Sequence, residues 1–308
     1  MIFLRIYNKY KRFYKYYTFC TNNNGEKLKL PINKFFYKIV TVQDSTKIIE
    51  NGKEESGVKG RKYNAGRKIA FGILAVLFAA AAGIFIYIQA YYHALPDLQE
   101  VWAGSGAGQV LENASEKWIT YGNTESGRGF IFYPGAKVEE EAYGPLMREI
   151  AEEGFFCVLV RMPGRLAVLG SGAAADVVAA YPEIGEWYLG GHSLGGAMAA
   201  GYAAEHAKEL SGLVLLAAYS TKPLPETVPV LSVYGSRDGV LNLEKYEECR
   251  ENLPKTAEEY VIEGGNHAGF GWYGEQKGDG KAEITPQEQW RLTAAEIGRW
   301  AADWKAAE

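Results

Sequence analysis

Short apolar runs alternate with longer helix-forming stretches along the chain from residue 118 onward. The apolar runs predict strands at 118–121, 129–133, 156–160, 187–190, 213–217, 229–234 and 259–262. The stretches between and after them predict helices at 139–153, 173–181, 194–207, 243–252 and 286–306. Continuously apolar strands separated by helices indicate an α/β fold, with a mostly parallel sheet and helices on both of its faces. About 180 residues are ample for one such core, and we expect this domain to span residues 118–308.

One long apolar run precedes the domain. Residues 69–88 are 20 consecutive residues without a charge, and about 20 apolar residues in a helix span the hydrocarbon core of a bilayer. The residues that follow are interfacial in character: Gln89, Tyr91, Tyr92 and His93. A buried core helix does not fit because the run lacks a polar face, and no small-residue cleavage site of a signal peptide follows. The run predicts an uncleaved signal anchor at 69–90, followed by a linker at 91–117.

The charges on either side of this run set its orientation. Residues 1–68 hold 16 of the 33 Lys and Arg residues but only 5 of the 37 Asp and Glu residues. After the run, the first basic residue is Lys117. Because positively charged flanks stay in the cytoplasm, we expect a single-pass protein of the cell membrane, with a cytoplasmic N-terminus and an extracytoplasmic domain. The acidic balance of that domain argues against nucleic acid as a partner.

Residues 1–57 fit no folded element. They are rich in Tyr, Phe, Lys and Asn and show no periodicity. Two interpretations stay open. The segment is either a basic, disordered stretch that lies on the membrane surface, or it is not normally translated and the protein starts at Val58.

A Gly-x-Ser-x-Gly pattern at residues 191–195 supplies the first candidate for chemistry. It lies between a predicted strand and an Ala-rich predicted helix. This context is typical of a nucleophile elbow, a sharp turn that lifts the serine hydroxyl clear of the sheet, above the positive end of a helix dipole. We expect Ser193 to be a nucleophile. The alternative is a glycine-rich turn with an incidental serine.

A serine nucleophile needs a base and an acid that orients the base. His267 lies in a Gly-rich loop after the last predicted strand and is the expected base, whereas His192 is expected only to point away from Ser193. Asp238 follows the predicted strand at 229–234 and is the expected acid, which gives the chain order Ser, Asp, His. Glu263 is the rival acid, less well placed at a strand end. The alternatives are a solvated loop histidine and an ordinary turn aspartate.

The tetrahedral intermediate of such chemistry needs backbone donors. The N–H group of Leu194, directly after the nucleophile, is one expected donor of this oxyanion hole. The N–H group of Ala136 is the other, because Pro134 and Gly135 form a turn after the strand at 129–133. A Pro-Gly pair that serves only as a turn is the alternative.

These four places together resemble the α/β-hydrolase superfamily. The stretches that carry the resemblance are YPGA at 133–136, GGHSLGG at 190–196, YGSRDG at 234–239 and GGNHAGFG at 264–271. The chain is most similar to small, uncapped, esterase-like members, here with an N-terminal membrane anchor. The resemblance covers residue 129 to the C-terminus, and it implies the α/β-hydrolase fold and serine-hydrolase chemistry.

The chain departs from the family pattern at two loops. Pro134-Gly135 stands where many members have His-Gly, which removes a side chain that usually braces the oxyanion loop. Arg161 and Arg165 occupy a loop that is usually acidic. These two arginines either meet an anionic substrate group or brace the loop.

The link between Ala218 and Val228 is too short for a helical lid, so we expect an open, shallow site for a small or compact ester. The sequence carries no phosphate loop, metal cluster or haem motif, so no cofactor or metal is expected. Free thiols are expected at three distant positions: Cys20, Cys157 and Cys249. The expected activity is hydrolysis of carboxylic esters through an acyl-enzyme. The alternatives are an extracytoplasmic binding protein without turnover, and an amidase, thioesterase or acyltransferase that uses the same triad.

Overall fold

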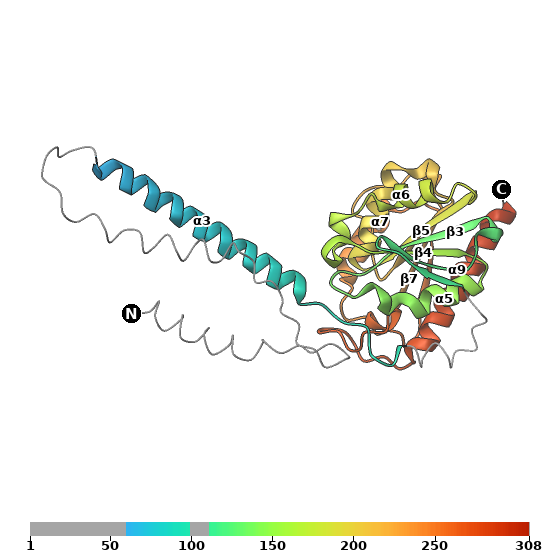
Figure 1. Cartoon of the computed structure of the whole chain (residues 1–308). Helices are drawn as coiled ribbons and strands as arrows, with labels where there is room; N and C mark the ends of the chain where they lie inside the picture. Colours follow the sequence, from blue (N-terminus) through green and yellow to red (C-terminus); the bar gives the residue numbers. More distant parts are fainter. Residues whose placement is uncertain (1–59, 99–110, 308) are drawn as a thin grey trace, which may run out of the picture. The chain divides into compact units, whose positions relative to one another are not determined.

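A computed structural model describes residues 60–98 and 111–307. The expectations for residues 1–57, Val58, Cys20 and residues 99–110 of the linker lie outside the described residues. Residues 111–307 contain one eight-stranded sheet with the order β1-β2-β4-β3-β5-β6-β7-β8. Figure 1 labels β3, β4, β5 and β7 of this sheet. Its strands are β1 (Glu112–Ala114), β2 (Trp118–Tyr121), β3 (Arg128–Tyr133), β4 (Phe156–Val160), β5 (Glu186–His192), β6 (Gly212–Leu216), β7 (Val230–Gly235) and β8 (Glu258–Ile262).

The mostly parallel sheet predicted from the apolar runs is confirmed. The strands from β4 through β8 in the sheet order are all parallel, whereas β1 and β2 are antiparallel. The predicted strands agree with β2 to β8 within a residue or two. The strand β1 was not predicted, because its three residues Glu112, Asn113 and Ala114 are polar or small and all exposed. The segment is a strand because it pairs with β2, and not because it has an apolar pattern of its own.

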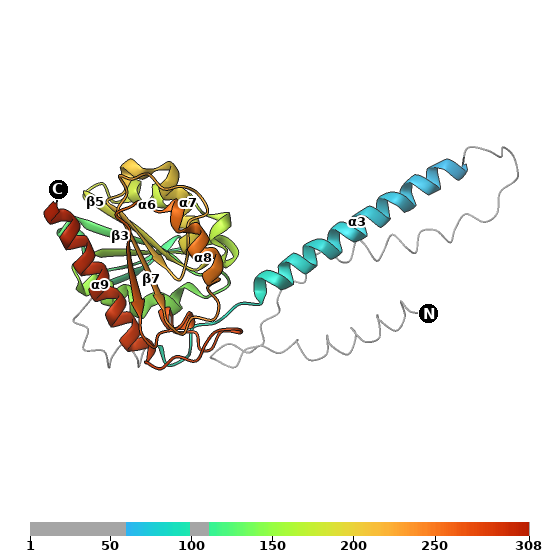
Figure 2. The ribbon, with the colours of Figure 1, turned by 180° about the vertical axis from the view of Figure 1, so that it is seen from behind.

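Helices cover both faces of the sheet. The helices α5 (Gly144–Glu152) and α9 (Pro286–Ala307) pack on one face, and α6 (Ala173–Ala180), α7 (Leu194–Glu205) and α8 (Leu243–Cys249) pack on the other (Figure 2). The alternation of strand side chains divides the core accordingly. In β3, Phe130 and Phe132 belong to the first face and Ile131 and Tyr133 to the second, and all four are fully buried. Each such side chain contributes about 1.5–3 kcal/mol through burial.

Two predicted helices begin or end differently from expectation. The stretch at 139–153 is a 3-10 turn (Glu140–Tyr143) followed by α5 with Pro145 in its first turn, and the stretch at 243–252 is α8 followed by a 3-10 turn (Arg250–Asn252). Between β6 and β7, residues 217–229 form no helix. The loops at the carboxyl ends of the parallel strands are therefore not covered by a helical insertion at this point of the chain.

The apolar run forms the helix α3 (Gly60–Gln89). Within the described residues, the part Gly66–Gln89 is long and apolar enough to cross a membrane. Its 24 residues cover about 36 Å at 1.5 Å per residue, and large apolar side chains along it are exposed, among them Phe71 and Phe78. Exposed apolar side chains along a whole helix are unfavourable in water and favourable in lipid.

Candidate active site

The turn between β5 and α7 holds Ser193 in a conformation that few L-residues adopt. Ser193 has φ 54° and ψ −123°, and its N–H group donates to the Leu216 carbonyl at 2.9 Å. A positive φ in a non-glycine residue costs energy and persists only where the surroundings impose it. This conformation places Ser193 directly before α7, where free N–H groups and the helix dipole favour negative charge.

His267 and Asp238, predicted as base and acid, meet directly. His267 Nδ1 lies 2.8 Å from Asp238 Oδ2, and the two side chains are 2% and 1% exposed. The other carboxylate oxygen, Oδ1, accepts the N–H groups of Val240 and Leu241 at 2.8 and 2.7 Å. Since a carboxylate only accepts hydrogen bonds, His267 donates from Nδ1 and carries its basic lone pair on Nε2. This Nε2 atom is buried and has no hydrogen-bond partner among the described residues.

Ser193 lies in the loop beside this pair. The ring of His192, the residue before it, packs on the ring of His267 with centroids 4.4 Å apart. The turn that carries Ser193 and the loop that carries His267 are therefore neighbours. The Ser193 hydroxyl and His267 Nε2 are not hydrogen-bonded to each other in this structure. The structure thus joins the predicted acid and base directly, and the turn that carries the predicted nucleophile lies beside the histidine loop.

Asp279 joins the acid and histidine loops, whereas Gln289 binds the histidine loop alone, and sequence analysis missed both. The Asp279 carboxylate accepts N–H groups from Gly239 at 3.0 Å, His267 at 3.2 Å and Ala268 at 2.8 Å. Gln289 of α9, which is 1% exposed, accepts from the Asn266 N–H at 3.0 Å and donates to the Asn266 carbonyl at 2.8 Å. Asp279 thus holds the backbone of His267 and Gln289 that of the preceding residue, and neither side chain belongs to a recognisable motif.

The loop after β3 packs directly against the start of α7. A Cβ atom on Gly195 would lie 2.2 Å from the Tyr133 carbonyl oxygen, so only glycine permits this approach. The two predicted oxyanion donors, Leu194 and Ala136, thereby lie on neighbouring segments.

A buried hydrogen-bond chain fixes the turn before Ala136. The Gly135 N–H donates to the Tyr143 hydroxyl at 3.1 Å, and that hydroxyl lies 2.8 Å from His192 Nδ1. Tyr143 is fully buried and His192 is 1% exposed. The brace that the Pro134-Gly135 departure was expected to remove is thus supplied by Tyr143 and His192. His192 was expected only to point away from Ser193, and its part in this chain was not predicted.

Burial keeps both partners of this chain neutral. Desolvation raises the pKa of Tyr143, and it lowers the pKa of His192 well below its usual value, with the nearby His267 lowering it further. A protonated Tyr143 needs an acceptor for its hydrogen, so it donates to His192 Nδ1, and the hydrogen of the neutral ring resides on Nε2. The neutral His192 ring lies tilted against the His267 ring.

The depressed pKa of His192 predicts a pH dependence of folding. Below about pH 6.5 the unfolded chain takes up a proton at His192 that the folded protein refuses, so the free energy of unfolding falls as the pH falls, by up to about 1.4 kcal/mol per pH unit. His192→Asn, which keeps an acceptor for Tyr143, should lose less stability than the wild type between pH 7 and pH 5. Urea unfolding of the detergent-solubilised chain at both pH values measures this, and parallel losses in the two proteins would contradict it.

Tyr143→Phe should destabilise the fold and impair the site. The variant leaves the Gly135 N–H and His192 Nδ1 without their partner in a buried place, which costs about 1–3 kcal/mol. It also frees the turn before Ala136, and we expect ester turnover to fall roughly tenfold through a looser oxyanion donor. Tyr273→Phe is the matched control, because that buried tyrosine donates to Gln276 at 3.0 Å and not to the site. Equal losses in the two variants in thermal unfolding and turnover would contradict this role.

The other residues considered as candidates from the sequence make structural contacts. Arg161 Nη1 binds Glu140 at 2.5 Å and Glu141 at 2.7 Å, so this arginine braces its loop. Arg165 stacks over the Tyr91 ring, 3.6 Å from its centroid. The rival acid Glu263 accepts from the Ser236 hydroxyl at 3.1 Å and not from His267.

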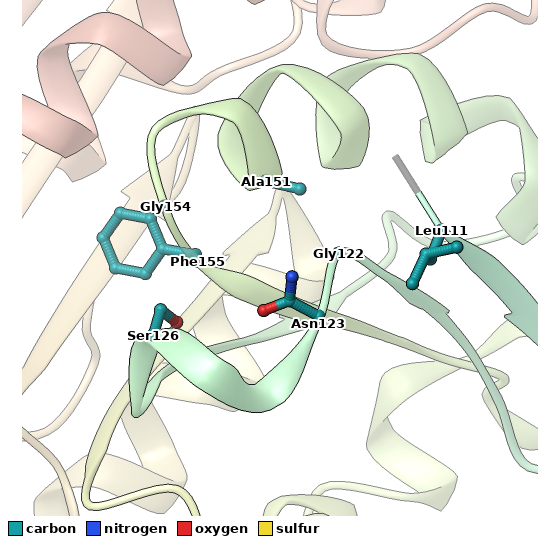
Figure 3. Close-up of a pocket in the computed structure, with 7 residues that line it drawn as sticks. All are labelled: Leu111, Gly122, Asn123, Ser126, Ala151, Gly154 and Phe155. Carbon is teal, nitrogen blue, oxygen red and sulfur yellow. The ribbon is translucent and has the colours of Figure 1, made fainter. Parts of the chain in front are cut away.

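Two cavities bear on where a ligand can bind. One of about 590 Å³ borders the histidine loop, with Ala268, Trp272 and Asp279 in its wall. Another of about 230 Å³, lined by Asn123, Phe155 and other residues (Figure 3), lies at the amino ends of β3 and β4. Ligands of open α/β sheets bind outside the carboxyl ends of the strands. Within residues 60–98 and 111–307, no three His, Cys, Asp or Glu side chains are grouped to hold a metal ion.

Comparisons with known proteins agree with this architecture. The family model described as "Alpha/beta hydrolase family" matches residues 129–291. The crystal structure of a putative lipase from Acinetobacter baumannii AYE is 14% identical and has a TM-score of 0.51, over 68% of this chain and 96% of that one. A novel esterase from Mycobacterium tuberculosis is 13% identical with a TM-score of 0.46, over 66% of this chain and 96% of that one. Likeness at such identity concerns the fold alone. A search of curated protein sequences finds no match.

Proposed function

The chain belongs to the alpha/beta hydrolase family, and on that premise we propose that it is a serine esterase that cleaves carboxylic esters of small or compact substrates through an acyl-enzyme. The observation that carries the proposal is the buried 2.8 Å hydrogen bond between His267 and Asp238, beside a turn that holds Ser193 at φ 54°. This is the arrangement that an activated serine requires.

In the first half of the reaction, the Ser193 hydroxyl oxygen attacks the ester carbonyl carbon and its proton passes to His267 Nε2. Asp238 stabilises the imidazolium that forms. The oxyanion accepts hydrogen bonds from the N–H groups of Leu194 and Ala136. Collapse of the intermediate breaks the bond between the acyl carbon and the alcohol oxygen, and the alcohol leaves with the proton from His267.

In the second half, His267 takes a proton from water, whose oxygen attacks the acyl-enzyme. The bond to Ser193 breaks, and the acid leaves with Ser193 protonated again. The missing Ser193–His267 hydrogen bond does not oppose this route, because such contacts are often long without substrate and tighten when it binds.

One feature of the fold supports a compact ester. The absence of a helix in residues 217–229 leaves no helical lid over the site from that link, so a long acyl chain gains little enclosure. Turnover of 4-nitrophenyl esters with acyl chains of increasing length tests this. We expect kcat/KM to be highest for acetyl or butanoyl and to fall for octanoyl. A maximum at octanoyl or beyond would contradict it. An acetyl thioester and an acetyl amide in the same assay distinguish an esterase from a thioesterase or amidase.

The helix α3 is proposed as a single-pass signal anchor with the catalytic domain outside the cell. The surplus of Lys and Arg residues before it and their absence from residues 69–116 support this orientation. Protease added to intact cells should then digest the domain. Protection of the domain until the cells are opened would reverse the orientation.

A further inference from the structure

The segment that follows α3 is bound to two loops of the candidate active site. We call residues 91–98 the strap. The Tyr92 N–H donates to the Lys137 carbonyl at 2.7 Å, and the Glu139 N–H donates to the Tyr92 carbonyl at 2.8 Å. Lys137 directly follows Ala136, the predicted oxyanion donor. The strap thus pairs with the oxyanion loop through its backbone.

The strap also binds the chain just after His267. The Leu95 N–H donates to the Trp272 carbonyl at 3.0 Å, and the Trp272 indole N–H donates to Asp97 at 2.8 Å. The Tyr92 and Tyr273 rings pack with centroids 5.6 Å apart. Although this segment was expected to be part of a linker, it contacts residues about 45 and 180 positions away in the chain.

These contacts limit how far the active-site loops can lie from the end of α3. Gln89 is the last residue of α3, and the three residues from there to Tyr92 cover at most about 11 Å. If α3 crosses the bilayer, this short chain length limits the distance between the end of the membrane helix and the edge of the sheet that carries Ser193, Asp238 and His267. A domain on a free linker has no such constraint.

The same edge exposes apolar side chains. Val168 and Leu169, in the loop after β4, are 56% and 58% exposed. Their loop is joined to the oxyanion loop, because the Lys137 N–H donates to the Arg165 carbonyl at 2.8 Å. Large aliphatic side chains exposed beside a membrane helix are suited to burial in the lipid interface. At the opposite edge, Leu111 is the comparable residue, 65% exposed beside the cavity of Figure 3.

We propose that the active-site edge lies on the membrane surface, with Val168 and Leu169 in the lipid interface, and that the substrate is a short-chain ester of a membrane-resident alcohol. This rests on the proposed esterase function and on α3 as the membrane anchor. The short acyl group enters the open site and passes to Ser193. The alcohol takes the proton from His267 and stays in the bilayer, and water then releases the acid. A site next to the bilayer needs no lid, because the membrane itself presents the ester.

The position of the edge is tested without reference to activity. Full-length protein with Cys20→Ser and Cys249→Ser, in which the remaining Cys157 is fully buried, carries a single fluorophore at Leu169→Cys or, as the matched control, at Leu111→Cys. Each is reconstituted in vesicles of phosphatidylcholine and phosphatidylglycerol that contain a nitroxide-labelled lipid. We expect quenching at position 169 to exceed that at position 111 severalfold. Equal quenching, or stronger quenching at 111, overturns the proposal.

The substrate class is tested by comparing two acetate esters. One is 4-nitrophenyl acetate in water, and the other is the acetate ester of a dioleoylglycerol in the same vesicles, with acetate release as the readout for both. The double variant Val168→Asp, Leu169→Asp should hydrolyse the vesicle ester at least tenfold more slowly than the wild type and the soluble ester within twofold of it. Leu111→Asp should change neither rate.

Equal effects of the double variant on both esters, including no effect, overturn the membrane-resident substrate. If wild-type protein hydrolyses neither ester, the proposed function fails, and the quenching experiment still decides whether the edge docks on the bilayer. The two failures are therefore distinguishable.

Discussion

Ser193→Ala is expected to lower ester turnover at least about 10⁴-fold, as removal of a nucleophile does in enzymes of this type. The substitution removes only the hydroxyl group. The backbone hydrogen bond from Ser193 to Leu216 remains, and so do the glycines that shape the turn. The loss should therefore appear in kcat, with an unchanged thermal unfolding midpoint.

Initial rates on 4-nitrophenyl acetate, combined with thermal unfolding, measure this effect. Ser220→Ala is the matched control, because Ser220 is also buried in a loop after a strand and its hydroxyl donates to the Lys222 carbonyl at 2.6 Å. We expect that variant to retain turnover within about threefold. Turnover by Ser193→Ala close to that of the wild type would show that another residue does the chemistry.

Asp238→Asn should reduce kcat about 10⁴-fold while the geometry of the site persists. The amide of asparagine retains an oxygen that can accept from Val240 and Leu241, as Oδ1 does now. Its NH₂ group then faces His267 Nδ1 and forces the hydrogen of the ring onto Nε2, the nitrogen that must take the proton from Ser193. The base is thereby disabled without being moved.

Glu263→Gln is the control for this second variant. Glu263 lies near the same loops but binds the Ser236 hydroxyl, so its substitution should change kcat by no more than about threefold. A larger loss in Glu263→Gln than in Asp238→Asn would transfer the role of the acid to Glu263.

Much of this fold can be predicted from local patterns in the sequence. The runs that form β3 to β8 are apolar because both faces of a parallel sheet are covered, and this produces a signal that needs no knowledge of the partner strands. The elbow is equally local, since the close approach of Gly195 to Tyr133 and the strained φ of Ser193 restrict the residues of one short stretch. Asp238 and His267 follow from their places after late strands.

The contacts that sequence analysis missed depend on residues far apart in the chain. Tyr143 and His192 are 49 positions apart and on different elements, and neither carries a spacing that marks the pair. Asp279 is one of three acidic residues in the polar loop at 274–285, and no motif marks it. The strap contains no periodic pattern, and its register is fixed by single hydrogen bonds to Lys137 and Trp272. Such features become visible only when the loops are placed side by side.

The measurement that tests the central claim most directly is covalent labelling of the full-length protein in membranes with a fluorophosphonate, followed by peptide mass spectrometry. A fluorophosphonate reacts with serines that a base has activated. An activated Ser193 should carry the adduct, and Ser193→Ala should carry none. A folded wild-type protein that remains unlabelled, or an adduct on another serine that persists in Ser193→Ala, would contradict the assignment of Ser193, His267 and Asp238 as the catalytic triad.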